Sequence, residues 1–189
     1  MKDGVFIVEM LRKGNEAREK AKQAFANISL EHLNWKPSEE SWNIGQCLDH
    51  LIISDCLYFP VFKKIADGKF EMKFWENWNP LNGFFGKILV SQVEEISRKK
   101  LKAPRIFEPS QSNIDLGILE RFHKHLDSLL GYIADFSKVD IDKTHITSPV
   151  SAVVTLSLRN VVTVIIQHEH RHINQALKVM QSKDFPASL

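Results

Sequence analysis

The stretch "IIQHEHRHINQAL", residues 165–177, places three of the chain's eight histidines within five residues. It lies in a longer segment, from about residue 156 to residue 181, whose apolar residues recur with the period of a helix. On a helix, residues four apart share a face, whereas residues two apart point in nearly opposite directions. The pattern therefore predicts that His168 and His172 continue an apolar stripe and point inward, while His170 faces solvent.

Three further segments show the same helical period. The first runs from about residue 3 to residue 27. The second begins at Asn43, which forms a capping-box pattern with Gln46, and Pro60 is expected to kink this helix or end its regular part. The third should run from about residue 114 to residue 136. Four long amphipathic helices joined by long connections predict an all-α fold, a four-helix bundle.

The connections are long and rich in Pro, Gly, Asn and Ser. We expect a loop from about residue 69 to residue 86 and a short extra helix from about residue 84 to residue 100. Residues 102–113 and 137–155 are expected to be connectors, the second ending at a helix cap formed by Thr155 or Ser157.

Composition indicates an ordinary globular protein. The chain has 189 residues, 43% hydrophobic and 25% charged, with a net charge of +2. This length predicts a single domain over residues 1–189 with its own core. Basic and acidic residues are interspersed, which argues against a nucleic-acid-binding protein. Because no apolar run reaches the roughly 18–20 residues that span a bilayer, we expect no membrane segment.

The two cysteines predict a reducing compartment. Cys47 and Cys56 would lie about 13–14 Å apart on one helix, whereas a disulfide requires Cα atoms within about 7 Å. Without a disulfide framework or an export signal at the N-terminus, we expect a cytoplasmic protein.

The histidine pattern suggests a metal site. Imidazoles at positions i and i+4 can ligate one divalent ion, although two core histidines with satisfied hydrogen bonds explain the pair equally well. His50 is the candidate third ligand, because it is the only histidine on the second helix. His125, at the edge of the core stripe of the third helix, is its competitor.

The order of these motifs resembles the DinB-like (DinB/YfiT-like) superfamily. The resemblance covers nearly the whole chain and rests on "NWKPSEESW", "NIGQCLDHL", "FEPSQS" and the H-x-x-x-H-x-x-Q pattern at His168, His172 and Gln175. It implies a four-helix bundle in which His50, His168 and His172 bind one metal ion. Two details differ from the common pattern, namely Asn43 at the helix cap and a proline loop, "TSPVSAVVT", that lacks a following glycine.

Three imidazole ligands would leave an ion such as Zn²⁺, or Ni²⁺ or Fe²⁺, with an open coordination position, as in catalytic sites. The resemblance implies a metal-dependent hydrolase or a transferase that uses a low-molecular-weight thiol. A non-catalytic metal-binding protein and a helical interaction module with vestigial histidines stay open as alternatives. We expect a small-molecule substrate, with a thiol as a candidate co-substrate and a homodimer as a candidate assembly. No general acid or base is identifiable, and Gln175 is a candidate for orienting a bound water.

The aromatic segment from residue 70 to residue 85 allows two interpretations. It contains Trp75, Trp78, Phe84 and Phe85. These rings could fill the open end of the bundle or a subunit contact. Alternatively they could form the wall of a substrate cavity beside the ion, because ligand pockets are mostly apolar.

Overall fold

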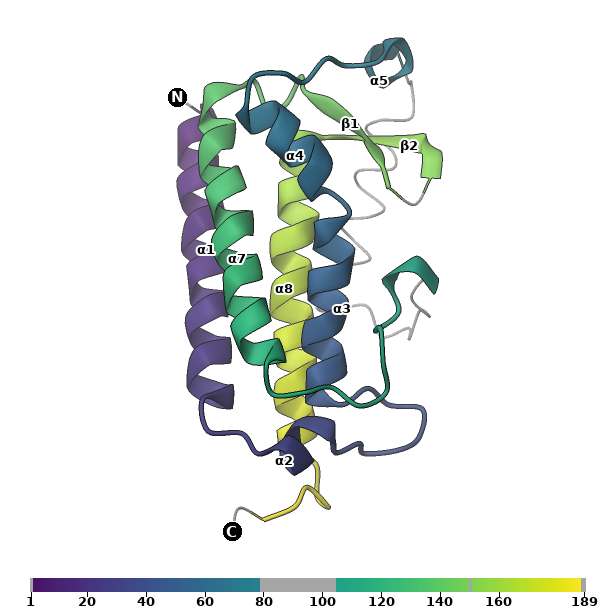
Figure 1. Cartoon of the computed structure of the whole chain (residues 1–189). Helices are drawn as coiled ribbons and strands as arrows, with labels where there is room; N and C mark the ends of the chain where they lie inside the picture. Colours follow the sequence, from purple (N-terminus) through teal and green to yellow (C-terminus); the bar gives the residue numbers. More distant parts are fainter. Residues whose placement is uncertain (1, 79–104, 150, 188–189) are drawn as a thin grey trace.

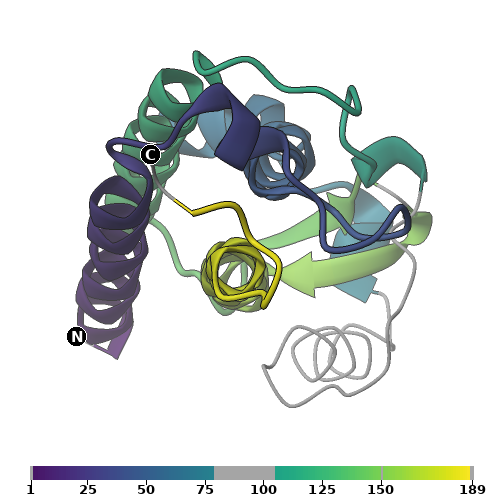
Figure 2. The same cartoon turned by 90° about the horizontal axis from the view of Figure 1, so that it is seen from below.

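A computed structural model describes residues 2–78, 105–149 and 151–187, and its centre is a bundle of four long helices (Figure 1). They are α1 (Lys2–Phe25), α3 (Ile44–Cys56), α7 (Ile118–Asp135) and α8 (Leu158–Met180). Helices α1 and α3 each pack against both α7 and α8. Helices α1 and α8 run in one direction and α3 and α7 in the other, and all four surround one core (Figures 1 and 2). The predicted all-α four-helix bundle is therefore confirmed.

Local signals position the helix ends. The Asn43 side chain accepts from the amide of Gln46 at 2.7 Å, and the Gln46 side chain accepts from the amide of Asn43, so the predicted capping box begins α3. Pro60 does not kink this helix. Instead α3 ends at Cys56, and Pro60 lies in the first turn of α4 (Phe59–Ala66), where the missing amide is tolerated.

Helix α7 starts later than the periodicity predicts, because the residues before it form hydrogen bonds that are not helical. The backbone amide and carbonyl of Ile114 both bind the Asn34 side chain, at 2.7 Å and 2.8 Å. The Asp115 carboxylate then accepts from the amide of Gly117, which forms a turn that delays the helix to Ile118.

Shorter elements complete the described part of the chain. They are α2 (Leu30–Asn34), α5 (Phe74–Trp78) and the 3₁₀ turns η1 (Arg105–Phe107) and η2 (Phe136–Lys138). The extra helix expected over residues 84–100 lies outside the described residues. The largest fully buried side chains include Phe25, Phe62, Phe122 and Phe136.

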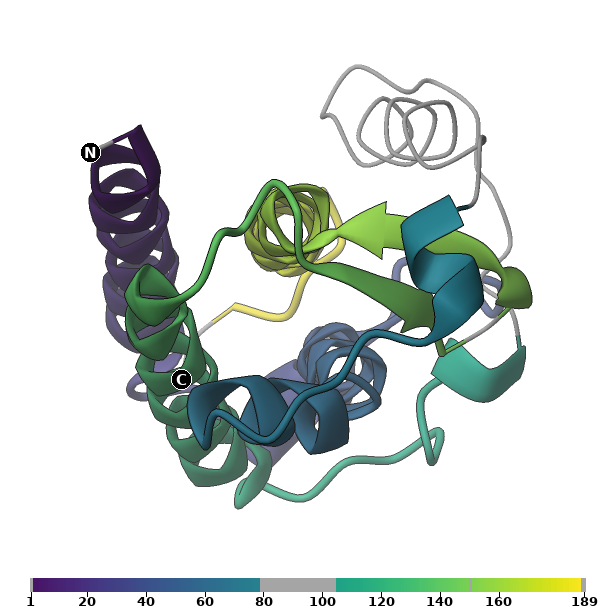
Figure 3. The ribbon, with the colours of Figure 1, turned by 90° about the horizontal axis from the view of Figure 1, so that it is seen from above.

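The connector expected over residues 137–155 contains an antiparallel hairpin that the sequence analysis did not predict. Strands β1 (His145–Ser148) and β2 (Ser151–Ser157) pair with Ile146 opposite Leu156. The β-branched residues of this segment favour strands, but the run is short and only partly buried, and Val153 is 72% exposed. Viewed from above, the hairpin extends beside the start of α8 and α5 lies over it (Figure 3).

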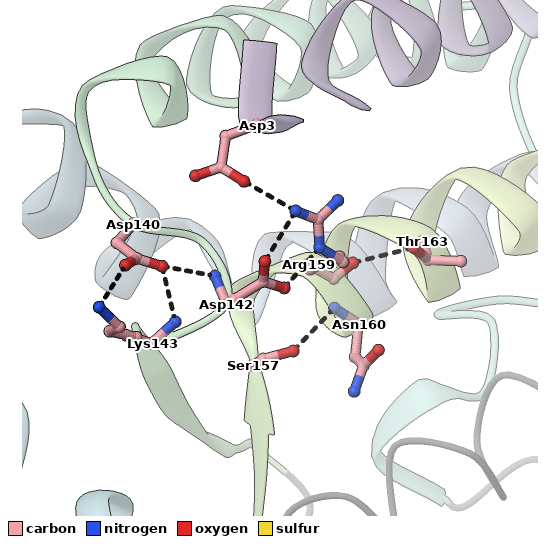
Figure 4. A network of polar contacts seen from close by, with 8 residues as sticks. All are labelled: Asp3, Asp140, Asp142, Lys143, Ser157, Arg159, Asn160 and Thr163. Carbon is pink, nitrogen blue, oxygen red and sulfur yellow. Dashed lines mark hydrogen bonds and ion pairs between the residues drawn. The ribbon is translucent and has the colours of Figure 1, made fainter. Parts of the chain in front are cut away.

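Helix α8 follows β2 directly, and an ion-pair network fixes this junction (Figure 4). The side chain of Ser157 accepts from the amide of Asn160, so the second of the two expected caps is the one observed. Arg159 binds Asp3 of α1 at 2.7 Å and also binds Asp142 before the hairpin. One guanidinium thus joins the first helix, the segment before the hairpin and the last helix at one end of the bundle.

Candidate metal centre

Three histidine side chains meet where α3 packs against α8. The Nε2 atoms of His50 and His168 are 3.0 Å apart. The ring centroid of His172 lies 4.4 Å from that of His50 and 4.5 Å from that of His168. Each histidine offers one ring nitrogen, and these nitrogens all lie within 4.8 Å of one another. The structure therefore brings together the three residues that the sequence selected, two of them from adjacent turns of one helix.

A backbone carbonyl determines which nitrogen of His50 faces this cluster. The Nδ1 atom of His50 lies within hydrogen-bond distance of the carbonyl oxygen of Phe107. A carbonyl can only accept, so Nδ1 must carry the hydrogen and Nε2 must carry the free electron pair. Nitrogen Nε2 is thus presented to the other two rings in the form that ligates a metal, and its partner at Nδ1 holds the ring in place.

Burial keeps the three imidazoles neutral. It lowers the pKa of His50 and of His172, and it lowers the pKa of His168 to about 4. The neighbouring histidines and the positive charge of Arg171 act in the same direction on His172. At neutral pH the rings are therefore unprotonated, which is the state that metal binding requires.

The donor set fits a divalent transition ion. Two nitrogens bound at about 2.0–2.1 Å from one ion can be at most about 4.2 Å apart. The 3.0 Å separation of the His50 and His168 nitrogens is well inside that limit. In addition, the Nδ1 atom of His172 is buried and has no hydrogen-bond partner among the described residues. Burying a ring nitrogen without a hydrogen bond costs free energy, and a bound cation would supply the missing interaction.

One aromatic ring covers the cluster. The Trp42 ring centroid lies 4.8 Å from that of His50 and 5.7 Å from that of His172. Trp42 directly precedes the capping box, so the same local structure that begins α3 also places this ring. The indole therefore packs against two of the three imidazoles.

The chain that follows η1 runs along α3, and we call residues 107–114 the strap (Figure 1). The Asp49 carboxylate accepts from both the amide and the hydroxyl of Ser110, each at 2.7 Å. The side chain of Gln46 donates to the carbonyl of Gln111, at 3.3 Å. Near its end, the strap approaches α3 so closely that a Cβ atom on Gly45 would lie 2.7 Å from that of Ile114. These contacts hold the Phe107 carbonyl opposite His50.

A second group of potential ligands lies in the bundle core, and the sequence analysis missed it. Asp55 of α3, His125 of α7 and Glu169 of α8 offer one ligand atom each within 4.8 Å. Glu169 follows Val162 and Ile166 along the buried stripe of α8, and that position could have identified it as an inward carboxylate. His125, considered above as a competitor of His50, belongs to this second group.

The remaining histidines lie elsewhere. The prediction that His170 faces solvent is wrong in part, because its ring is half-buried and its Nε2 atom lies 3.0 Å from the carbonyl oxygen of Lys13 in α1. It packs there because α1 lies parallel to α8 and covers that side. His32 stacks near Phe185, and His145 lies in β1.

The aromatic segment is only partly described. Trp75 is 51% exposed, and its Nε1 atom donates to the hydroxyl of Thr147 in β1 at 3.4 Å. This residue therefore lies against the hairpin. Phe84 and Phe85 lie outside the described residues, as does the side chain of Trp78, so the cavity-wall interpretation stays a prediction for these three.

Within the described ranges, no helix is both long and apolar enough to cross a membrane. The two cysteines are free thiols, as predicted, with Cys47 buried and Cys56 exposed.

Comparison with known proteins gives one family and one relative. The model of the DinB superfamily matches residues 15–176, which include α3 and α7 in whole, most of α8 and the C-terminal part of α1. An uncharacterized protein of Bacillus subtilis (strain 168), YuaE, is 27% identical over 169 residues, covering 88% of this chain and 94% of YuaE. No solved structure matches the chain.

Proposed function

The chain belongs to the DinB superfamily, and we propose that it is a metal-dependent enzyme whose ion is bound by His50, His168 and His172. One observation carries this proposal. The three neutral ring nitrogens converge from two helices, and a backbone carbonyl turns the free nitrogen of His50 toward the other two. An ordinary packed core gives no reason for three imidazoles to face one another with an unsatisfied nitrogen among them.

An ion held by three imidazole ligands would retain an open position, where it would lower the pKa of a bound water or thiol. The protein's own contribution is to hold the ligands. The strap fixes the ring of His50, and the Trp42 ring packs over His50 and His172. His168 is half-buried, whereas the other two are buried, so a small molecule would approach from the side of His168.

We propose that the reaction is the attack of a small nucleophile, water or a low-molecular-weight thiol, on an electrophilic small-molecule substrate. Zn²⁺ is the first candidate for the ion, followed by Ni²⁺ and Fe²⁺, because an all-imidazole site suits each of them. The alternative is a protein that binds the metal without catalysis. It would show the same metal content and no turnover.

Metal content of protein purified without an affinity tag tests the ligand set. We expect His172→Ala to contain one fewer equivalent of metal than the parent chain, and His50→Ala to behave in the same way. His170→Ala is the matched control, because it removes a histidine from the same helix and should leave the metal content unchanged. Equal metal content in the parent and in His172→Ala would overturn the assignment.

Activity then separates the two reactions. The metal-loaded protein would be assayed with simple esters and amides, and in parallel with a low-molecular-weight thiol and an electrophile. We expect turnover in one of these assays, lost in His172→Ala and retained in His170→Ala. Metal binding without turnover in either assay would favour the non-catalytic alternative.

A further inference from the structure

Three ionisable side chains from three helices meet in the bundle core, and none of them belongs to the three-histidine cluster. The Nε2 atom of His125 lies 3.3 Å from an Asp55 carboxylate oxygen and 3.5 Å from a Glu169 carboxylate oxygen. All three residues are buried, with exposed fractions of 1% for Asp55, 4% for His125 and 0% for Glu169. Charged side chains are almost never buried this completely unless they are paired or bind a metal.

Glu169 is the member of the group whose carboxylate makes no hydrogen bond. Both of its carboxylate oxygens are buried, and neither has a hydrogen-bond partner among the described residues. It occupies a position on the buried stripe of α8 that would otherwise suit an apolar residue. A buried carboxylate without a hydrogen bond costs several kcal/mol on general grounds. Its contact with the His125 ring nitrogen, at 3.5 Å, leaves both carboxylate oxygens able to bind a cation.

The group has the donors for a cation. With both carboxylates ionised and the imidazole neutral it would carry a charge of −2, which one divalent cation would balance. Without a cation the group holds protons more tightly than usual, because burial raises the pKa of Glu169 and the neighbouring Asp55 carboxylate raises the pKa of His125 against the effect of burial. The separations also fit, because atoms bound at about 2.0–2.2 Å from one ion lie no more than about 4.4 Å apart. The distances of 3.3 Å and 3.5 Å from His125 are inside that limit.

The ring of His125 is already oriented for such a role. It stacks on Phe59 with a centroid distance of 5.3 Å and an interplanar angle of 8°. Its other nitrogen, Nδ1, lies 3.9 Å from the sulfur of Cys56, a weak hydrogen-bond partner. Nitrogen Nε2 therefore points at the two carboxylates.

We propose that Asp55, His125 and Glu169 bind a second divalent cation. Two carboxylates and one imidazole form a harder donor set than three imidazoles, so the ion is of the Mn²⁺ or Fe²⁺ class. Because the ligands come from α3, α7 and α8, this ion joins three helices in the core and acts as a structural cross-link. The proposal does not depend on the proposed function, since the two groups share no ligand.

Mn²⁺ binding to the full chain in the His172→Ala background tests this proposal, because that background lacks one ligand of the first group. The protein would be stripped with a chelator and titrated with Mn²⁺, with free Mn²⁺ measured by electron paramagnetic resonance. We expect one bound ion per chain, and at least a tenfold loss of affinity when Glu169→Gln is added. Glu76→Gln is the matched control. Glu76 is also buried, but it accepts hydrogen bonds from Thr147 and Lys73, and its replacement should leave Mn²⁺ affinity unchanged.

Absence of bound Mn²⁺, or full binding in the Glu169→Gln variant, would overturn the proposal. If Glu169→Gln does not fold, Asp55→Asn replaces it with the same expectation. Pulsed resonance of the Mn²⁺ complex adds a direct readout. We expect the signal to be modulated by one imidazole nitrogen, and we expect this modulation to disappear in His125→Gln. If the modulation persisted in His125→Gln, the ion would be bound elsewhere.

Discussion

Replacing Asp49 should loosen the strap and weaken the metal site at the same time. The Asp49 carboxylate accepts two hydrogen bonds from Ser110, one from the amide and one from the hydroxyl, each at 2.7 Å. A hydrogen bond to a charged group contributes about 1.5–3 kcal/mol, and the exposure of Ser110 places these bonds at the lower end. We therefore expect Asp49→Ala to lower the free energy of unfolding by about 3 kcal/mol.

A double-mutant cycle isolates this contact. Ser110→Ala removes only the hydroxyl bond, so it should cost about 1–1.5 kcal/mol alone and almost nothing in the Asp49→Ala background. Urea unfolding of the four metal-free proteins, followed by circular dichroism, measures the coupling. Asp49→Asn is the matched control, because it keeps the shape and one acceptor and should lose less than Asp49→Ala.

Metal affinity gives the second readout. The strap carries the Phe107 carbonyl that orients His50, and loss of such an indirect contact typically weakens metal binding about 10–100-fold. A coupling energy below about 0.3 kcal/mol would refute the reasoning on stability. Unchanged metal affinity in a clearly destabilised Asp49→Ala protein would refute the reasoning on orientation.

Three further predictions concern the whole chain. Chelation should leave the protein helical and cooperatively folded with a lower melting temperature, because the bundle has its own core; loss of most of the circular dichroism signal would contradict this. A thiol reagent should label Cys56 quickly in the native protein and Cys47 only after unfolding, since burial raises the pKa of the Cys47 thiol to about 12. Acid should destabilise the metal-free protein. Burial lowers the pKa of His168 to about 4 in the folded state, whereas the same side chain has a pKa of about 6.5 in the unfolded state. The unfolded state therefore binds the proton first as pH falls, which favours unfolding. Stability should then fall by on the order of 1–3 kcal/mol as pH decreases from about 6.5 to about 4, and less in His168→Gln, as urea unfolding at several pH values would measure.

The sequence predicted those parts of the molecule that follow from the helical period and from local caps. The capping box at Asn43 and the shared face of His168 and His172 depend only on residues within one or two turns. His50 could be selected because it is the only histidine on its helix and the helix had to pack in the same bundle. Each of these inferences uses short-range geometry together with one assumption about packing.

The sequence did not predict features that depend on tertiary contacts. The position of Glu169 on the buried stripe of α8 indicates an inward carboxylate, but its partners Asp55 and His125 come from two other helices and become known only from the packing. The hairpin after residue 144 is a short β-branched run stabilised partly by Glu76 of α5, which accepts from Thr147 across 71 positions of sequence. The burial of His170 depends on the parallel neighbour α1, and nothing within its own helix indicates that contact.

The strap has a consequence for how this protein can diverge. It contacts α3 largely through its main chain, namely the carbonyls of Phe107, Gln111 and Ser112 and the amide of Ser110. Main-chain groups are common to almost every amino acid, so most substitutions along the strap preserve these bonds. Relatives can therefore change the identity of these residues while they keep the orientation of His50. Proline at position 110 is the exception, because it would remove the amide that binds Asp49.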